Sequence, residues 1–167
     1  MNGKWEKFPL IKQGDDMRGE YTNKLDDKGR LMIPPKIRKE LGFTNLILTR
    51  SREKCLRLYC EEEYEKVEKE IMDTKGSDID GRILNVNRRL IAACAELEMD
   101  KSGRINIPVS FRKYAGLELK ENCTVLGSGS FVEIWNEKDY LNWAENVDEN
   151  LEQDVNYLLE IIRKEGK

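Results

Sequence analysis

The sequence predicts a strand-rich α+β fold made from two pseudo-symmetric copies of one small unit. The segment 25–34 recurs as segment 99–108, with Asp, Gly, Arg and Pro at identical spacing. In both copies a polar turn is followed by alternating apolar and polar residues, which is typical of a strand with one buried face. A helical segment then follows the proline. A repeat at a fixed period indicates one structural unit per copy.

The repeated segment opens with a short strand, at 20–25 in the first copy, and turns at Asp-x-x-Gly. The carboxylates of Asp26 and Asp100 can accept backbone N–H groups two residues further on. Gly29 and Gly103 supply the positive φ that such a turn usually requires. Both copies therefore predict a tight turn between two strands.

An arginine begins the strand after each turn. Leu31 and Ile33 share one face of the first of these strands, so Arg30 lies on the other face, and Arg104 is placed likewise. The pattern predicts two outward arginines, each close to a turn. The alternative is an ion pair that only stabilises the turn, since exposed pairs of this kind contribute little. Spacing alone leaves both roles open.

A short helix follows each proline. Pro35 suits the first helical residue, and Gly42 suits the position just past a helix at 36–41. In the second copy Ser110 is predicted to cap the helix and Gly116 to end it. Each unit thus continues from its second strand into a short helix.

Two more strands and a longer helix complete each unit. Glutamates at 61–63 favour the positive end of a helix dipole, and Asn136 is a good N-cap for the second copy. Strands are predicted at 46–49, 55–59, 124–126 and 131–135, with Gly127, Ser128 and Gly129 in the turn of the second copy.

Between and after the repeats, the sequence predicts two further helices. The helix at 79–95 is expected to leave its arginines in solvent and to bury Ile83, Val86, Leu90, Ala93 and Cys94. The C-terminal helix carries an apolar stripe of Leu151, Val155, Leu158, Leu159 and Ile162. This stripe needs a covering surface, and a neighbouring subunit or the body of the same chain would serve. The predicted parts are an N-terminal extension (1–16), a first repeat (17–73), a linker and helix (74–95), a second repeat (96–144) and the C-terminal helix (145–167).

Composition limits the classes of function. The 167 residues are 37% charged with a net charge of −3, so binding to an acidic partner has to rest on local basic patches. There is no histidine, the commonest general base, and none of the four cysteines lies in a Cys-x-x-Cys pair. We therefore predict no catalytic residue, metal, cofactor or small-molecule substrate. Without a long apolar run or a signal pattern, we expect a cytoplasmic protein with no membrane partner.

Several motifs occur in an order found in one bacterial family. They are the two segments 26–34 and 100–108, Thr49-Arg50, Leu56-x-Leu58-Tyr59, Tyr114-Ala115-Gly116-Leu117 and Glu133-Ile134-Trp135. In these motifs, and over residues 17–144, the chain resembles the MraZ family of DNA-binding transcriptional regulators. The resemblance implies an AbrB-like swapped-hairpin β-barrel with flanking helices, and a nucleoid-associated, ring-shaped homo-oligomer. It also implies binding of double-stranded DNA at short direct repeats, in the promoter of the division and cell-wall gene cluster.

The resemblance also implies roles for the repeated segment, because its Asp-x-x-x-Arg signature contacts DNA in the family. We expect Arg30 and Arg104 to contact bases. The residues expected to orient them are Asp26, Gly29, Asp100 and Gly103. The expected phosphate contacts are Lys28, Lys36, Arg38, Lys39, Lys101, Arg112 and Lys113.

Two other functions stay open at this point. A protein-interaction module of the antitoxin type predicts one repeat per chain, dimers and a disordered tail, whereas this chain has two repeats and a tail with helical spacing. A purely structural oligomer predicts no retardation of any DNA at low salt, where nonspecific binding is strongest.

Overall fold

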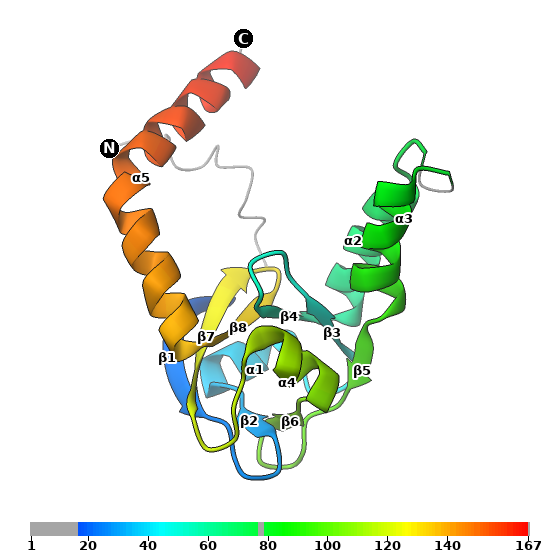
Figure 1. Cartoon of the computed structure of the whole chain (residues 1–167), viewed down its shortest axis with the longest axis vertical. Helices are drawn as coiled ribbons and strands as arrows, with labels where there is room; N and C mark the ends of the chain where they lie inside the picture. Colours follow the sequence, from blue (N-terminus) through cyan, green and yellow to red (C-terminus); the bar gives the residue numbers. More distant parts are fainter. Residues whose placement is uncertain (1–16, 77–78, 167) are drawn as a thin grey trace. The chain divides into compact units, whose positions relative to one another are not determined.

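Strands from both repeats are interleaved in one sheet (Figure 1). The computed structural model describes residues 17–76 and 79–166, so the predicted extension at 1–16 lies outside the described residues. The first repeat contains β1 (Met17–Lys24), β2 (Arg30–Met32), α1 (Pro35–Leu41), β3 (Leu46–Arg50), β4 (Leu56–Cys60) and α2 (Glu61–Met72). Then follow α3 (Gly81–Val86), the π-helix η1 (Asn87–Ala92), β5 (Ala95–Leu97), β6 (Arg104–Asn106), α4 (Val109–Ala115), β7 (Asn122–Gly129), β8 (Val132–Asn136) and α5 (Glu137–Glu165).

The main sheet is antiparallel, with the strand order β1-β7-β8-β4-β3-β5. The first strand of each repeat pairs with the third strand of the other, because β1 lies on β7 and β5 lies on β3. A separate ladder joins β2 to β6. The predicted α+β class is confirmed. Within the described residues the main sheet is open at β1 and β5, however, so the closed barrel that the resemblance implies is not found.

The β2–β6 ladder ties the two repeated segments to each other. Leu31 lies opposite Ile105, and both side chains are fully buried. Just beyond the ladder, the N–H of Ile33 donates to the carbonyl of Gly103 at 3.0 Å, and the N–H of Ile107 donates to that of Gly29 at 2.9 Å. The turn of each repeat is therefore held by the strand of the other.

The main core brings together residues of the sheet, the β2–β6 ladder and the helices α1 and α4. Gly42 and Gly116 follow these two helices, as predicted. Full burial of one aliphatic side chain contributes about 1.5–3 kcal/mol, so this core supports the two turns. Its helical members are Ile37, Leu41, Phe111 and Ala115, and its strand members include Leu31, Leu48, Leu58, Ile105 and Ile134.

A second cluster lies where α2 and η1 meet β3 and β4. It contains Ile47, Tyr59, Tyr64 and Ile91, and the rings of Tyr59 and Tyr64 meet edge to face at 5.7 Å. This cluster fixes the hairpin made by α2, α3 and η1.

The segment expected as one helix at 79–95 is a short α-helix, a π-helix and a strand. The wider π turn shifts the buried face, so Ile91 is buried whereas Val86 is 44% exposed, and the predicted face is wrong at Val86. The carbonyl of Leu90 in this turn accepts the hydroxyls of Thr49 at 2.6 Å and Tyr64 at 3.1 Å. These two bonds satisfy the hydrogen-bonding capacity of a carbonyl in the irregular turn.

Two other local predictions need correction. Helix α4 begins at Val109 after Pro108, whose φ of −59° already suits a helix start, so Ser110 lies inside the helix and caps nothing. Strand β7 continues through Gly127 to Gly129 because β1 pairs with it over all eight residues. A Cβ on Gly127 would lie 2.7 Å from the carbonyl carbon of Met17, so the strands approach too closely there for a side chain.

The last helix forms a unit of its own. The described residues divide into two compact units, one that ends at Asn136 and one that begins at Glu137, and within the second α5 is a continuous helix of 29 residues. The tail predicted at 145–167 is thus the continuation of the helix that follows β8. Across the described residues, none of the helices combines the length and apolar character that crossing a membrane requires.

Candidate nucleic-acid interface

The first turn is held by one carboxylate. Oδ1 of Asp26 accepts the backbone N–H of Lys28 at 2.9 Å and of Arg30 at 2.8 Å, and Oδ2 accepts the Nε–H of Arg30 at 2.7 Å. Gly29, with φ of +78°, donates its N–H to the Asp26 carbonyl at 3.2 Å. The aspartate therefore fixes both the backbone of the turn and one edge of the guanidinium.

The second turn has the same construction. Oδ1 of Asp100 accepts the backbone N–H of Ser102 at 2.8 Å and of Arg104 at 3.0 Å, and Oδ2 accepts the Nε–H of Arg104 at 2.8 Å. Gly103 has φ of +79°. Two separate stretches of sequence thus give nearly the same arrangement of hydrogen bonds.

These bonds favour the ionised aspartates. The pKa of Asp26 lies below its ordinary value of 3.8, chiefly because the backbone N–H of Arg30 donates to the carboxylate, with help from that arginine's side chain. The pKa of Asp100 is lowered in the same way by Arg104. At neutral pH both carboxylates are charged and both keep their arginine in place.

The two arginines lie on one face of the β2–β6 ladder. The register offsets Arg30 and Arg104 by two residues about the buried pair Leu31 and Ile105, so both point outward. Their Cα atoms are diagonal neighbours, about 7–8 Å apart. Their side chains are 29% and 30% exposed. Within the described residues, each side chain bonds only its aspartate, through Nε, which leaves the terminal Nη groups for a ligand.

Arginines of the two short helices lie against these turns, each on the turn of the opposite repeat. Nη1 of Arg38 donates to the Ser102 carbonyl at 3.0 Å, and a Cβ on Gly103 would come within 1.7 Å of that nitrogen. Nε of Arg112 donates to the Ile107 carbonyl at 3.0 Å and lies 3.0 Å from the Cβ position of Gly29. Both arginines are half-buried. The structure thus gives them a bracing role that the sequence did not reveal, and their phosphate contacts stay a prediction.

The predicted lysines are exposed to solvent. The exposed members of the set are Lys28, Lys36, Lys39, Lys101 and Lys113. Lys28 and Lys101 belong to the two turns, and each turn also has an arginine of the opposite repeat beside it, Arg112 at the first and Arg38 at the second. Cations next to two outward guanidiniums give a surface that suits the phosphates and base edges of a nucleic acid.

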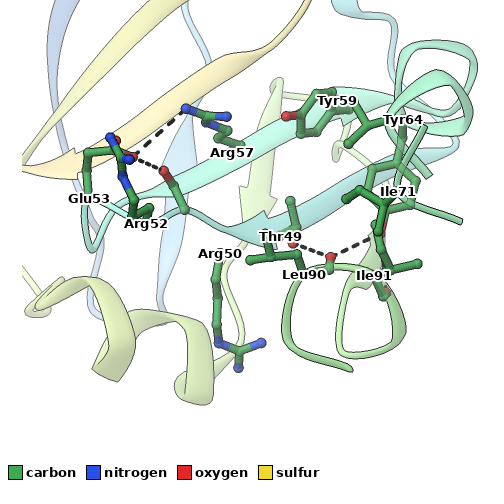
Figure 2. A pocket seen from close by; sticks show the side chains of 12 residues that line it. Thr49, Arg50, Arg52, Glu53, Arg57, Tyr59, Tyr64, Ile71, Leu90 and Ile91 are labelled. Carbon is green, nitrogen blue, oxygen red and sulfur yellow. Dashed lines mark hydrogen bonds and ion pairs between the residues drawn. The ribbon is translucent and has the colours of Figure 1, made fainter. Parts of the chain in front are cut away.

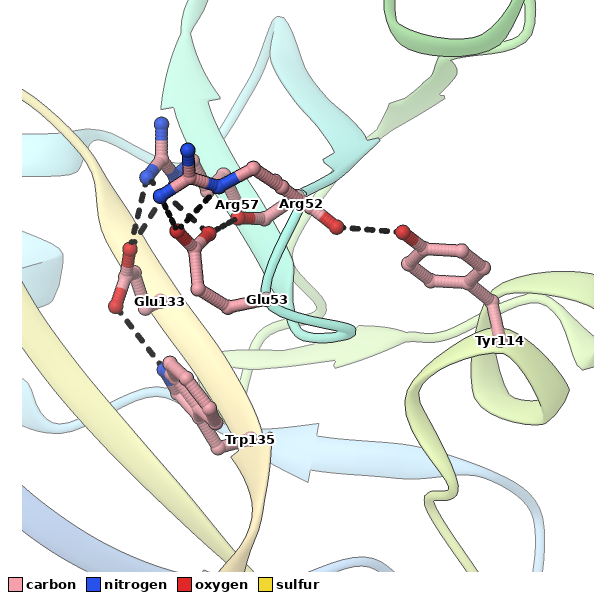
Figure 3. A network of polar contacts seen from close by, with 7 residues as sticks. Arg52, Glu53, Arg57, Tyr114, Glu133 and Trp135 are labelled. Atoms are coloured by element: carbon pink, nitrogen blue, oxygen red, sulfur yellow. Dashed lines mark hydrogen bonds and ion pairs between the residues drawn. The ribbon is translucent and has the colours of Figure 1, made fainter. Parts of the chain in front are cut away.

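A polar network joins the two repeats elsewhere in the sheet (Figure 3). Arg57 contacts Oε1 of Glu133 at 3.2 Å, and Nε1 of Trp135 donates to Oε2 of the same carboxylate at 3.0 Å. Arg57 and Glu133 lie directly opposite each other in the β4–β8 ladder. They also occupy equivalent positions of the two repeats. Opposite charges at equivalent positions could have indicated an ion pair between the repeats, which our sequence analysis did not predict.

A cleft of about 290 Å³ opens beside this network, lined by residues of β3, β4, α2 and η1 (Figure 2). Its charged end is occupied by internal bonds, because Ser51 donates to Glu53 at 2.5 Å and Arg52 contacts the same carboxylate at 3.1 Å. The Ser51 hydroxyl is the main cause that lowers the pKa of Glu53. Because these charged groups bond to one another, we assign them a structural role.

Arg50 is a buried cation that the sequence did not single out as a structural residue. It is 6% exposed, with its Cζ 4.2 Å from the centre of the Phe111 ring and its Nη1 donating to the Ala93 carbonyl at 3.0 Å. Burial, with the nearby charge of Arg89, lowers its pKa. In Figure 2 its guanidinium points away from the charged end of the cleft. Arg50 therefore connects α4 to the end of η1.

Fold and site together define a class of protein: a chain of two fused repeats that presents two aspartate-held arginines on one shared ladder. The sequence model of a family described as "MraZ protein, putative antitoxin-like" matches residues 17–87 and 90–160. A relative from Treponema denticola named "Transcriptional regulator MraZ" is 43% identical over 145 residues, which cover 87% of this chain and 99% of the relative. The chain belongs to the MraZ family, as the motifs predicted.

Proposed function

We propose that this chain is a transcriptional regulator that binds double-stranded DNA through the outward face of the β2–β6 ladder and its two turns. One observation carries the proposal: Arg30 and Arg104 lie on the same face, and an aspartate holds each of them by Nε. The name of the Treponema denticola relative supports the regulatory role.

The arginines are proposed to read bases. A guanidinium held at Nε keeps its Nη edge directed outward, and an arginine that bonds guanine O6 and N7 gives about 1–3 kcal/mol of discrimination. The Cα separation of about 7–8 Å corresponds to about two base-pair steps of 3.4 Å. We expect Arg30 and Arg104 to contact base pairs about two steps apart in one stretch of major groove.

The exposed lysines are proposed to contact phosphates. These contacts position the protein without reading sequence, and each adds to the salt dependence of binding. Arg38 and Arg112 are proposed to contribute in two ways, since each uses one nitrogen on a backbone carbonyl and has others for a phosphate. The acidic helices keep this binding local, which is consistent with the net charge of −3.

Assembly is proposed to strengthen the contact. In a closed ring of identical subunits, binding at one repeat of the DNA makes binding at the next intramolecular, so weak contacts gain avidity. Direct repeats in the promoter of the division and cell-wall gene cluster suit a head-to-tail ring, in which all subunits face the same way round. The protein is then expected in the cytoplasm, associated with the nucleoid.

Gel-shift titration on the chain's own upstream region tests the proposal. Arg30→Ala is expected to weaken binding to the specific duplex by about 5- to 150-fold, as loss of one bidentate base contact implies, while the mass in solution stays unchanged. Arg52→Ala is the matched control, because the Arg52 side chain is 92% exposed and lies outside the interface.

Two results would contradict the proposal. One is an unchanged specific affinity of Arg30→Ala. The other is a wild-type chain that retards no duplex at low salt, which would favour a protein-interaction role.

A further inference from the structure

Two exposed helical faces of opposite charge take no part in the interface described above. The first, the basic face, consists of Ile79, Arg82, Val86 and Arg89, and follows the outer side of α3 and η1. The second, the acidic stripe, consists of the apolar residues of α5 and the carboxylates beside them. Its members are Leu151, Val155, Leu158, Leu159 and Ile162, with Asp148, Glu152 and Asp154.

The basic face combines cations with apolar side chains. Ile79 is 81% exposed, Val86 is 44% exposed and the Arg82 side chain is 96% exposed. Nε of Arg82 lies 4.0 Å from a carboxylate oxygen of Asp80, an exposed and long contact that contributes little. Arg89 is also exposed. Val86 lies between the two arginines along the helix axis, and Ile79 extends the row at its start.

The acidic stripe has the complementary composition. Leu151, Val155 and Leu159 are 48%, 45% and 39% exposed, and they recur every four residues along one side of α5. At 100° per residue, Asp148 lies on this side of the helix, and Asp154 lies just beyond Leu158 at its edge. Acidic residues outnumber basic ones in α5 by nine to three. An amphipathic helix of this kind is stabilised when another surface covers its apolar side.

We propose that the acidic stripe of one copy docks on the basic face of a second copy. The inference rests on the proposed function, since it names the surfaces that would build the proposed ring. Apolar side chains then meet apolar ones, and carboxylates meet guanidiniums. Two acidic stripes facing each other would instead bring like charges together. A DNA backbone would pair with the arginines but would leave Ile79 and Val86 uncovered.

The geometry of such a contact leads to rings. The two surfaces differ and both belong to the same chain, so each copy has one of each to offer. A contact between unlike surfaces is heterologous, and it gives a closed ring when the rotation between copies closes. The same contact covers both faces in every subunit.

Charge reversal tests the proposal by light scattering on the full chain. Arg82→Glu with Arg89→Glu reverses the basic face, and Asp148→Lys with Asp154→Lys reverses the acidic stripe. Each double variant is expected to lose the wild-type assembly and approach the monomer mass of 19.5 kDa. An equimolar mixture of the two is expected to regain it, because each provides the surface that the other can bind. The chain with all four changes is expected to assemble alone.

Controls separate this inference from the proposed function. Arg52→Glu reverses an exposed charge outside both surfaces and is expected to keep the wild-type mass. Circular dichroism checks the fold, and a duplex with one recognition site checks Arg30 and Arg104 independently of assembly. If charge reversal and rescue occur but no variant binds DNA, the docking stands and the proposed DNA binding fails.

The inference is overturned if the wild-type chain is a monomer, if both double variants keep the wild-type mass, or if the mixture stays dissociated. It is also overturned if Arg82→Glu with Arg89→Glu keeps its mass but loses the one-site duplex, which would assign the basic face to phosphates.

Discussion

The two turns are alike where they present an arginine and unlike where they are supported. The distance from Nε to Oδ2 is 2.7 Å in the first turn and 2.8 Å in the second. Arg38, however, crosses to the Ser102 carbonyl of the other repeat, whereas Arg112 donates to Ile107 of its own. The hydrogen bonds that orient each turn arginine are therefore determined within its own short segment. The contacts that brace each turn, in contrast, depend on packing between segments. Equivalent substitutions in the two turns should therefore have equal effects on how the arginine is held. They should have unequal effects on stability where they disturb the bracing arginines.

The largest effect on stability is expected at the centre of the sheet, where equivalent positions of the two repeats carry opposite charges, Arg57 and Glu133. Glu133→Arg places two guanidiniums opposite each other in the β4–β8 ladder, and loss of a partner from a buried pair costs about 3–5 kcal/mol. Because the Arg57 side chain is 33% exposed, we expect the lower end of this range in the free energy of unfolding. Denaturant titration measures it.

A charge swap is the control for this prediction. Arg57→Glu combined with Glu133→Arg should recover most of the loss, although the bond from Trp135 disappears. A double variant as unstable as the single one would show that packing, and not the ion pair, governs this position.

A smaller, unequal effect is expected at the two turn glycines. Alanine in place of Gly29 or Gly103 is expected to destabilise the fold by about 1–2 kcal/mol, because the backbone there is left-handed. Gly103→Ala also displaces the Arg38 guanidinium and its hydrogen bond, which adds about 1 kcal/mol, whereas Gly29→Ala meets Arg112 only at 3.0 Å. Chemical denaturation of both variants measures the difference.

The same pair of glycines can be compared in a chain with Arg38→Ala. Without that guanidinium the two alanine variants should be equally destabilised. A difference that persists would place its origin in the backbone of the second turn.

The smallest effect is expected from acid. The pKa of both Asp26 and Asp100 is lower in the folded chain than the ordinary 3.8, so their contribution to stability is complete above that value. It is lost as the pH falls through 3.8 and further through the lowered pKa. The variant with Asp26→Asn and Asp100→Asn should therefore lose less thermal stability between pH 6 and pH 3 than the wild-type chain. Equal losses would show that other groups control the acid response.

Local features of the fold could be predicted from the sequence. The strand after each turn, the helix that begins at Pro35 and the helix ends at Gly42 and Gly116 all follow from residues a few positions apart. The hydrogen bonds of Asp26 and Asp100 belong to the same class, because spacing within the turn determines them.

Contacts across the chain could not be predicted in this way. An alternating pattern shows which face of a strand is buried but not which strand lies beside it, so the pairing of β1 with β7 was not anticipated. The bond from Arg38 to Ser102 depends on the pairing of β2 with β6, which an alternating pattern does not specify either. The π turn at η1 could not be predicted, because a helical period assumes a constant number of residues per turn.

The pairing of Arg57 with Glu133 has a consequence for the origin of this architecture. In a symmetric dimer of single repeats, the residue on the twofold axis can only meet an identical residue, and two arginines there would repel. Joining the halves in one polypeptide lets this axial position carry an acid on one side and a base on the other. Two such halves favour each other over copies of themselves, and their covalent linkage brings one of each together in every chain.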